Sequence, residues 1–236
     1  MPDDDVIADQ IAYYRARASE YDEWWKREGS YDLGAEVKAK WLAEVQLVDE
    51  ALEAFTPKGR VLELASGTGW WSERLARTAS DLTCVDASPE AIEIARTRVP
   101  QARLIAADLF VWEPQERFDV VFFSFWLSHV PQSRFDWFWG FVRNALTADG
   151  RVFFIDNLRT PMLELEGSAA HRHDEQPDGV VERHLNDGST FRAVKVHHNP
   201  DELAERLRAL GWVADVKTTG DFFYYGHATP SRKSWM

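Results

Sequence analysis

The chain has 236 residues, of which 45% are hydrophobic and 28% are charged, and its formal net charge is −12 at pH 7. This length and composition fit one soluble α/β domain, and no apolar run approaches the roughly 20 residues that a membrane span requires. The acidic charge argues against a nucleic-acid partner, because phosphate binding depends on clustered lysine and arginine, and it favours a small molecule instead.

The N-terminal segment, residues 1–56, is predicted to form a helical cap. Its first ten residues are acidic and polar, unlike a secretory or transit signal, so we expect a cytoplasmic protein. Residues 6–28 carry apolar side chains at steps of three and four, which predicts one helix, and residues 35–55 repeat the pattern until Pro57. The first helix is rich in aromatic residues, and it is interpreted either as a packed helix or as a lid over a ligand.

A mostly parallel sheet is predicted for the core, residues 57–156. Strands and helices alternate there at the spacing of βαβ units, with Ser88 as the N-cap of a helix that begins at Pro89. The apolar run 118–123 predicts a strand that is buried on both faces, at the centre of the sheet. Ligands bind at the carboxyl ends of such strands. The polar residues expected at that edge are Glu63, Asp86, Asp108, Ser124 and Asp156.

A small-residue turn over residues 65–69 joins the first strand of this core to a helix. Because Gly67 and Gly69 lack a β-carbon, a ligand can lie directly against their backbone, and the start of the following helix offers free N–H donors. We interpret this turn as a nucleotide-type cofactor site.

The rest of the chain is predicted to be an insertion, residues 157–198, followed by a closing segment, residues 199–236. The insertion begins irregularly and then alternates around an Asp-Gly turn, which predicts a hairpin over 180–196. The closing segment begins with a helix capped by Asn199 and continues with two strands. All four segments are expected to form a single domain.

The irregular part of the insertion contains a His-x-His pair, His171 and His173. Two histidines at this spacing can bind a metal ion, but no cysteine or further spaced histidine completes a familiar zinc pattern. The sequence therefore predicts no metal site.

The order and spacing of these motifs resemble the class I S-adenosylmethionine-dependent methyltransferase family over residues 60–156. The family's first motif, an acidic residue followed by alternating glycines, corresponds to the run from Glu63 to Gly69. Ala65 replaces the first glycine, which an alanine can do if its φ angle is negative. The resemblance implies a Rossmann-like, doubly wound and mostly parallel sheet of about seven strands. To this sheet the residue patterns above add an N-terminal helical lid and a β-hairpin insertion.

The same resemblance implies S-adenosylmethionine (SAM) as the cofactor and S-adenosylhomocysteine (SAH) as its product. Asp86 corresponds to the acid that holds the ribose hydroxyls, as a charged acceptor for two O–H donors. Asp108 with Leu109 is similar to the pair that binds the adenine. The full set of implied cofactor residues is Glu63, Ala65, Ser66, Gly67, Gly69, Trp70, Asp86, Ala87, Asp108, Leu109 and Ser124.

Methyl transfer needs an oriented acceptor atom, and it needs a general base where that atom starts protonated. His129 is the first candidate for this base, because a neutral imidazole near pH 7 suits the task. The alternative is that His129 only braces its loop. Tyr14, Tyr21 and Asp156 are the further catalytic candidates.

The chain contains 11 tryptophans, several of them near the turns where a pocket is expected. A pocket lined by tryptophan suits a planar, apolar or cationic molecule, through stacking and cation–π attraction, although each tryptophan can also simply pack in the core. We therefore expect a small, aromatic or heterocyclic methyl acceptor. The candidate acceptor contacts are Tyr13, Trp24, Trp25, Trp126 and His184.

Two other functions remain open at this point. A glycine-rich turn followed by an acid also occurs in NAD(P)-dependent oxidoreductases, but their fingerprint has a third glycine where this chain has Ser72. A non-catalytic binding protein on the same scaffold is the other alternative. The sequence also leaves open whether the protein forms a homodimer.

Overall fold

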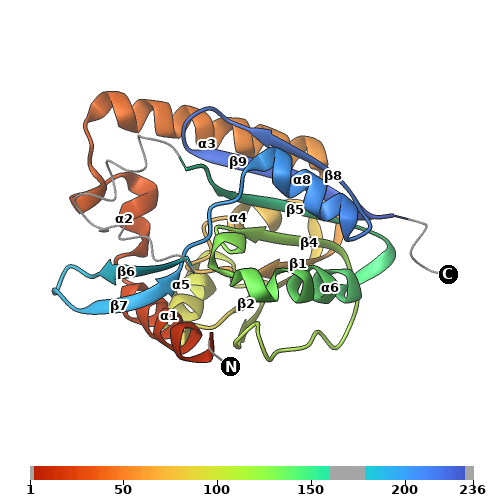
Figure 1. The fold of residues 1–236 in the computed structure, drawn as a ribbon, viewed down its shortest axis with the longest axis horizontal. Helices are drawn as coiled ribbons and strands as arrows, with labels where there is room; N and C mark the ends of the chain where they lie inside the picture. The colour runs from red at the N-terminus through yellow and green to blue at the C-terminus, as the bar shows by residue number, and fades with distance from the viewer. Residues whose placement is uncertain (1–2, 160–178, 232–236) are drawn as a thin grey trace.

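The computed structural model describes residues 3–159 and 179–231. Its centre is a seven-stranded sheet in the order β3-β2-β1-β4-β5-β9-β8, in which all neighbours pair in parallel except β9, which is antiparallel to β5 and β8 (Figure 1). The strands are β1 (Gly59–Leu64), β2 (Ala79–Asp86), β3 (Arg103–Ala106), β4 (Phe118–Ser124), β5 (Leu146–Asn157), β8 (Trp212–Thr218) and β9 (Phe223–Pro230). The predicted fold class is confirmed.

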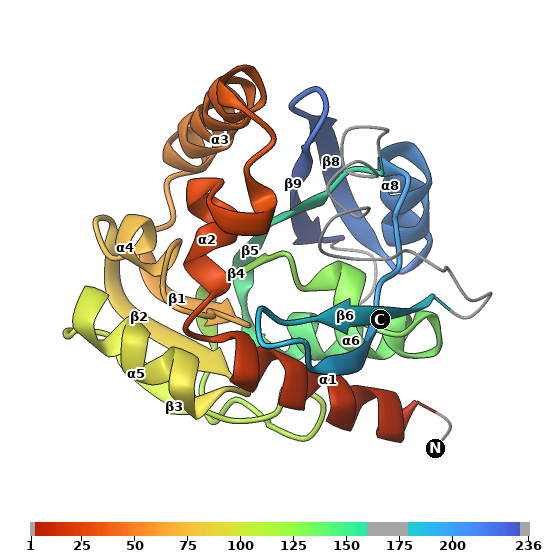
Figure 2. The ribbon, with the colours of Figure 1, turned by 90° about the vertical axis from the view of Figure 1, so that its left-hand side faces the viewer.

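Helices cover both faces of this sheet. Figure 2 shows α3, α4 and α5 on one side of the sheet and α6 and α8 on the other. These helices are α3 (Ala35–Phe55), α4 (Ser72–Leu75), α5 (Pro89–Arg98), α6 (Phe135–Ala145) and α8 (Pro200–Ala209). Two of their predicted N-caps are confirmed, because Ser88 Oγ accepts from Ala91 N–H and Asn199 Oδ1 accepts from Asp201 N–H.

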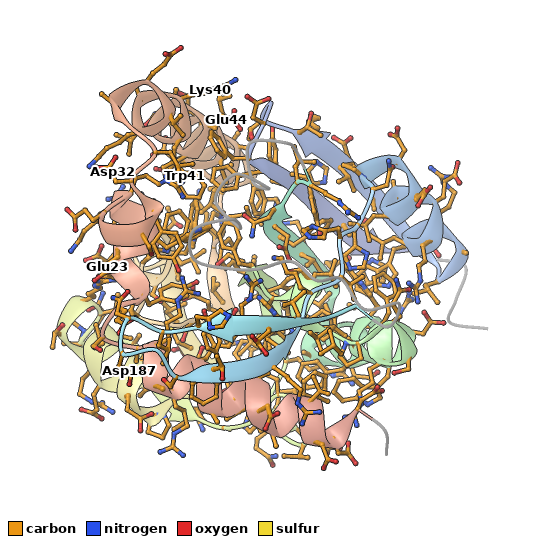
Figure 3. All side chains as sticks on the ribbon, turned by 60° about the vertical axis from the view of Figure 1, so that its left-hand side comes forward. Glu23, Asp32, Lys40, Trp41, Glu44 and Asp187 are labelled. Atoms are coloured by element: carbon orange, nitrogen blue, oxygen red, sulfur yellow. The ribbon has the colours of Figure 1, made fainter. Side chains whose placement is uncertain are left out.

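The central position of β4 explains its unbroken apolar sequence. Side chains alternate across a strand, so Val121 and Phe123 pack toward the cluster that contains α6 and α8. Val120 and Phe122 pack toward the opposite cluster, where Trp41 of α3 lies fully buried (Figure 3). Both faces of this strand are therefore apolar, as the sequence predicted. None of the helices in the described part of the chain is long and apolar enough to span a bilayer.

The prediction of one helix over residues 6–28 is wrong, because the structure has two helices there. α1 (Asp4–Arg17) ends before a turn, and α2 (Tyr21–Lys26) follows it, with a short 3-10 helix at Gly29–Tyr31. The buried guanidinium of Arg17 lies within 5.6 Å of the ring centres of Tyr13, Tyr21 and Tyr31, which come together because the chain turns at this point.

The predicted hairpin is confirmed as β6 (Val180–His184) and β7 (Thr190–Val194), and it packs on α1 (Figures 1 and 2). Val194 N–H donates to Gln10 Oε1 of α1, at 3.0 Å. At the tip, Asn186 Nδ2 donates to Glu23 of α2, and Figure 3 shows the neighbouring Asp187 on the same side of the molecule as Glu23. We refer to α1, α2, β6 and β7 together as the cap.

Candidate active site

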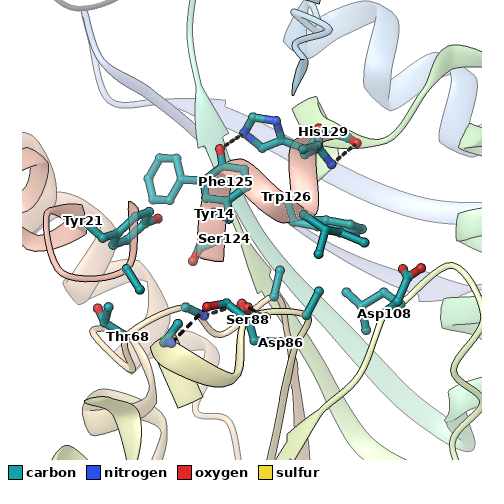
Figure 4. Close-up of a pocket in the computed structure, with 18 of the residues that line it drawn as sticks. Tyr14, Tyr21, Thr68, Asp86, Ser88, Asp108, Ser124, Phe125, Trp126 and His129 are labelled. Atoms are coloured by element: carbon teal, nitrogen blue, oxygen red, sulfur yellow. Dashed lines mark hydrogen bonds between the residues drawn. The ribbon is translucent and has the colours of Figure 1, made fainter. Parts of the chain in front are cut away.

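A pocket lies between the cap and the carboxyl ends of β1, β2 and β4 (Figure 4). The cap contributes one wall, and the turns after the strands contribute the other. The predicted site residues that the structure brings together around it are Tyr14, Tyr21, Ala65, Gly67, Asp86, Ala87, Asp108, Leu109, Ser124, Trp126 and His129.

The turn over residues 65–69 forms the floor of this pocket. Gly67 and Gly69 have φ angles of 55° and 86°, in the region that favours glycine, and Gly67 N–H donates to Asp86 Oδ2 at 2.8 Å. Ala65 has a φ angle of 52°. The condition under which an alanine replaces this glycine freely, a negative φ, is therefore not met. The backbone here is strained, because a β-carbon crowds the carbonyl in this region.

This strain leads to a stability prediction. Ala65→Gly is expected to increase the free energy of unfolding by about 0.5–1 kcal/mol, since relief of a left-handed alanine outweighs the entropy that glycine loses. Urea unfolding measures the change. Ala106→Gly, at an exposed position in β3, is the matched control and is expected to destabilise. A loss of stability in Ala65→Gly as large as in the control contradicts the assignment of strain.

Asp86 and Asp108 supply the two carboxylates of the pocket. Asp86 Oδ1 accepts from Ser88 N–H at 2.8 Å, while Oδ2 accepts from Gly67, so the carboxylate is fixed in orientation and each oxygen keeps a free lone pair. Burial raises the pKa of Asp86, and the two backbone N–H donors oppose that rise. Asp108 Oδ1 accepts from Phe110 N–H at 2.9 Å. Both acids can therefore accept further hydrogen bonds from a bound ligand.

Tyr14 and His129 form a hydrogen-bonded pair at the opposite end of the pocket (Figure 4). His129 Nδ1 lies 2.6 Å from Val194 O, and because a carbonyl only accepts, Nδ1 carries the proton. The Tyr14 hydroxyl lies 2.7 Å from Nε2 and donates to it. Burial, followed by the charges of Lys195, Arg183 and Arg17, holds the pKa of His129 well below its usual range. His129 is therefore neutral, and Tyr14 keeps its oxygen lone pairs for other partners.

The depressed pKa of His129 predicts a loss of stability in acid. The folded protein takes up this proton only well below pH 6.5, whereas the unfolded chain takes it up near pH 6.5, so the contribution is complete above that pH and falls below it. Between pH 6.5 and 5.5 this proton is expected to lower the free energy of unfolding of the wild type by up to about 1.4 kcal/mol. We expect His129→Gln to abolish this part of the loss.

Urea unfolding of both proteins across this pH range measures the effect. Burial also lowers the pKa of His198, so the variant keeps part of the slope. The exposed His227→Gln is the control, and it is expected to keep the full slope of the wild type. Identical slopes in His129→Gln and wild type contradict the assignment of a neutral, buried His129.

Several predicted cofactor residues do not line this pocket. Glu63 is buried beside Cys84 and accepts a hydrogen bond from Ser72 Oγ. Trp70 stacks on Trp25 with ring centres 5.2 Å apart. The other two are Ser66 and Gly69. Gly69 has a packing role instead, since an added β-carbon would lie 3.1 Å from Ala95 Cβ.

The remaining candidates also lie outside the pocket. Asp156 is fully buried and accepts from both the N–H and the hydroxyl of Ser128, which makes it a brace for the loop that carries His129. Trp24 and Trp25 belong to the hydrophobic core. Tyr13 is buried against Tyr14, and His184 pairs with Glu182 at the end of β6.

Other residues line the pocket although the sequence did not indicate them as site residues: Gln10, Ile11, Ala18, Thr68, Ser88, Ala91, Phe110 and Phe125. Ile11 and Ala18 lie at steps of three and four from Tyr14 and Tyr21, on the apolar stripe predicted over residues 6–28, so that pattern contained the signal. The sequence gives no comparable signal for Phe125, whose φ angle of 52° depends on the loop around it.

No group of metal-binding side chains occurs among the residues that the structure describes. His171 and His173 lie outside the described residues.

Comparisons with known proteins identify the family of the chain. Residues 61–150 match the family described as a methyltransferase domain. A structure of DhpI with SAH has 36% sequence identity and a TM-score of 0.77, covering 97% of this chain and 98% of that chain. A complex of DhpI with SAM and HEP has 38% identity and a TM-score of 0.78, covering 96% and 99%.

A more distant match shows the fold alone. The 1,6-didemethyltoxoflavin-N1-methyltransferase of Burkholderia thailandensis, solved with 1,6-didemethyltoxoflavin and S-adenosylhomocysteine, is 16% identical with a TM-score of 0.61, covering 95% of this chain and 88% of that chain. No curated protein matches the chain.

Proposed function

Because the chain belongs to the class I SAM-dependent methyltransferases, we propose that it transfers the methyl group of SAM to a small molecule held under the cap. When bound, SAM supplies an electrophilic methyl group on its sulfonium. The protein then has to orient the acceptor atom and exclude water, which together can contribute on the order of 7–11 kcal/mol.

The residues of the pocket fit SAM. Asp86 is a buried carboxylate with a free lone pair on each oxygen, which suits two neighbouring hydroxyl donors. It lies beside Gly67, where the absence of a side chain lets a ligand approach the backbone. Asp108 and Leu109 line the same side of the pocket. These residues support ribose binding at Asp86 and adenine binding at Asp108 and Leu109.

The Tyr14–His129 pair supports removal of a proton from the methyl acceptor at the end of the pocket opposite Asp86 and Asp108. Tyr14 directs its proton to His129 Nε2, so its oxygen can accept a proton from the substrate while the original proton moves to the histidine. Val194 O fixes the tautomer that such a relay requires. We assign Tyr14 as the group that contacts the acceptor and His129 as its proton partner. The hydrogen bond between Tyr14 and His129 is the observation that carries the proposal.

A small acceptor is supported by the cap, which covers the pocket with residues of α1 and with Tyr21 of α2. The hairpin is bound to α1 through Gln10. The DhpI complex with SAM and HEP holds a component besides SAM, and by likeness we place the acceptor of this chain next to SAM as well. The aromatic or heterocyclic acceptor stays a prediction. Its support is reduced to Tyr21, Phe125 and Trp126, since Trp24 and Trp25 pack in the core.

Transfer of a radioactive methyl group from labelled SAM tests this proposal. Panels of small molecules, RNA and protein are incubated with the full chain, and we expect label only in small molecules. Label in RNA or protein, or in nothing, contradicts the proposal. The comparisons favour neither an NAD(P)-dependent oxidoreductase nor a non-catalytic protein.

Tyr14→Phe tests the assigned role with any acceptor that the panel identifies. We expect turnover to fall about 100-fold or more, because proton transfer typically contributes that much, while SAH affinity stays unchanged. Tyr225→Phe, on β9 and outside the pocket, is the control. Equal turnover in the two variants contradicts the role of Tyr14.

A further inference from the structure

Three cationic side chains are buried close to the Tyr14–His129 pair. Arg17 at the end of α1 is 8% exposed, Arg183 of β6 is 6% exposed, and Lys195 just after β7 is 7% exposed. Charged side chains are rarely buried unless an opposite charge accompanies them, because removing a charge from water is costly. Arg17 and Arg183 of the cap, with Lys195 beside it, therefore bring three positive charges into a buried region.

The register of the hairpin places Arg183 on its inner face. Along β6, Val181 and Arg183 are buried and Glu182 between them is exposed, as the alternation of a strand requires. Arg183 lies opposite Phe191, whose ring centre is 5.9 Å from that of Tyr13 on α1. Arg183 thus faces the helix that carries Tyr14.

Arg17 reaches the same region from α1. Its guanidinium donates to Tyr31 Oη at 2.9 Å and lies 5.0 Å from the ring centre of Tyr21, which lines the pocket. Lys195 Nζ donates to Ser128 Oγ, in the residue that precedes His129, at 2.9 Å, and it lies 3.8 Å from Asp156 Oδ1. None of the three cations lines the pocket itself, but each lies next to an element that does. Arg17 lies against Tyr21, Arg183 faces α1, and Lys195 bonds the loop that carries His129.

Within residues 3–159 and 179–231, no carboxylate pairs with Arg17 or Arg183. The exposed arginines of the same elements behave differently, since Arg15 pairs with Glu90 and Arg192 pairs with Asp9. The charges of Arg17, Arg183 and Lys195 also act on His129, which lines the pocket, because all three lower its pKa. Arg17 and Arg183 therefore lie behind the pocket wall formed by α1 and Tyr21. The exposed arginines of the same elements have carboxylate partners.

We propose that Arg17 and Arg183, with Lys195, form a subsite for an oxyanion carried by the methyl acceptor. This inference rests on the proposed function and specifies its substrate class as a small acid. Guanidinium groups suit carboxylates and tetrahedral oxyanions equally, because their N–H donors match two oxygens of either group. A bound anion supplies the opposite charge that Arg17 and Arg183 lack in this part of the chain.

Calorimetric titration of the SAH-loaded full chain with inorganic phosphate and with acetate tests the subsite. Ionic strength is held constant with chloride, because salt screens exposed charges but not a specific site. We expect at least one of the two anions to bind at one site. Tighter binding of phosphate indicates a tetrahedral oxyanion on the acceptor, and tighter binding of acetate indicates a planar carboxylate. We expect Arg183→Gln to weaken that binding at least about tenfold.

Arg192→Gln is the matched control, because Arg192 lies on the same hairpin but faces outward and pairs with Asp9. It is expected to bind the anion as the wild type does. Arg183→Lys keeps the charge but loses the paired N–H donors, so it is expected to bind the anion more weakly than the wild type and more tightly than Arg183→Gln. Absence of binding by both anions, or equal weakening in Arg183→Gln and Arg192→Gln, overturns the inference.

The loading step separates this inference from the proposed function. If SAH fails to bind, the proposed function itself fails. If SAH binds and label is transferred only to neutral small molecules, while neither anion binds, the methyltransferase assignment stands and the oxyanion subsite is wrong.

Discussion

Asp86→Ala is expected to weaken SAH binding by at least about 100-fold. Two hydrogen bonds from ribose hydroxyls to a charged acceptor contribute roughly 1.5–3 kcal/mol each, and a loss of about 2.7 kcal/mol already corresponds to this factor. The variant also removes the acceptor of Gly67 N–H, which fixes the turn below the cofactor. Isothermal titration with SAH measures the change directly.

Asp81→Ala provides the control for this experiment. Asp81 lies on the same strand, β2, but it is exposed and far from the carboxyl end of the strand. We expect its SAH affinity to equal that of the wild type. If Asp86→Ala binds SAH within a few fold of the wild type, the cofactor does not use this carboxylate and the placement of SAM in the pocket is wrong.

Glu63→Gln is expected to stabilise the protein, with an effect that grows as the pH rises. Burial raises the pKa of Glu63 to about 8, whereas the unfolded chain has a value near 4.5. The folded state therefore keeps the proton between these values and the unfolded state releases it, so the wild type loses stability as the pH rises from 4.5 to 8. A glutamine is neutral at every pH and avoids this loss.

The expected gain is on the order of 3 kcal/mol at pH 7, and it is near zero at pH 4.5. Urea unfolding at the two pH values measures it, and the exposed Glu73→Gln on α4 is the control. A gain that is the same at both pH values contradicts a protonated Glu63. The SAH affinity of Glu63→Gln is a second measurement. The contact between Glu63 and the cofactor stays a prediction, and a large change in this affinity supports it.

The sequence predicts most of the sheet because its signals are local or depend on burial alone. The apolar run of β4 requires two covered faces, and Ser88 and Asn199 cap their helices through their own side chains. The ends of β2 and β4 carry Asp86 and Ser124 into the pocket, as the geometry of parallel strands requires.

The parts that sequence reasoning missed depend on contacts between distant segments. The apolar stripe of residues 6–28 continues through the break after Arg17, so the pattern gives no sign of it. Trp24 and Trp25 look the same in sequence whether they line a pocket or pack against Trp41. The burial of Arg183 likewise depends on the hairpin lying on α1, because in sequence it reads as one of the many surface charges.

The left-handed Ala65 is a third kind of miss. The sequence motif indicates where the turn lies, but the φ angle at its first position is set by the strand that precedes it and by Ser66 N–H, which donates to Val85 O of β2. Alanine is tolerated there because neighbouring contacts hold the backbone in place. The identity of the residue alone gives no indication of that angle.

A crystal structure of the full chain with SAH tests the central claim most directly. We expect the ribose to bind Asp86, the adenine to lie beside Asp108 and Leu109, and the sulfur to face Tyr14 and His129 across the space left for the acceptor. SAH bound elsewhere, or with its sulfur directed away from Tyr14, contradicts the placement of methyl transfer in this pocket.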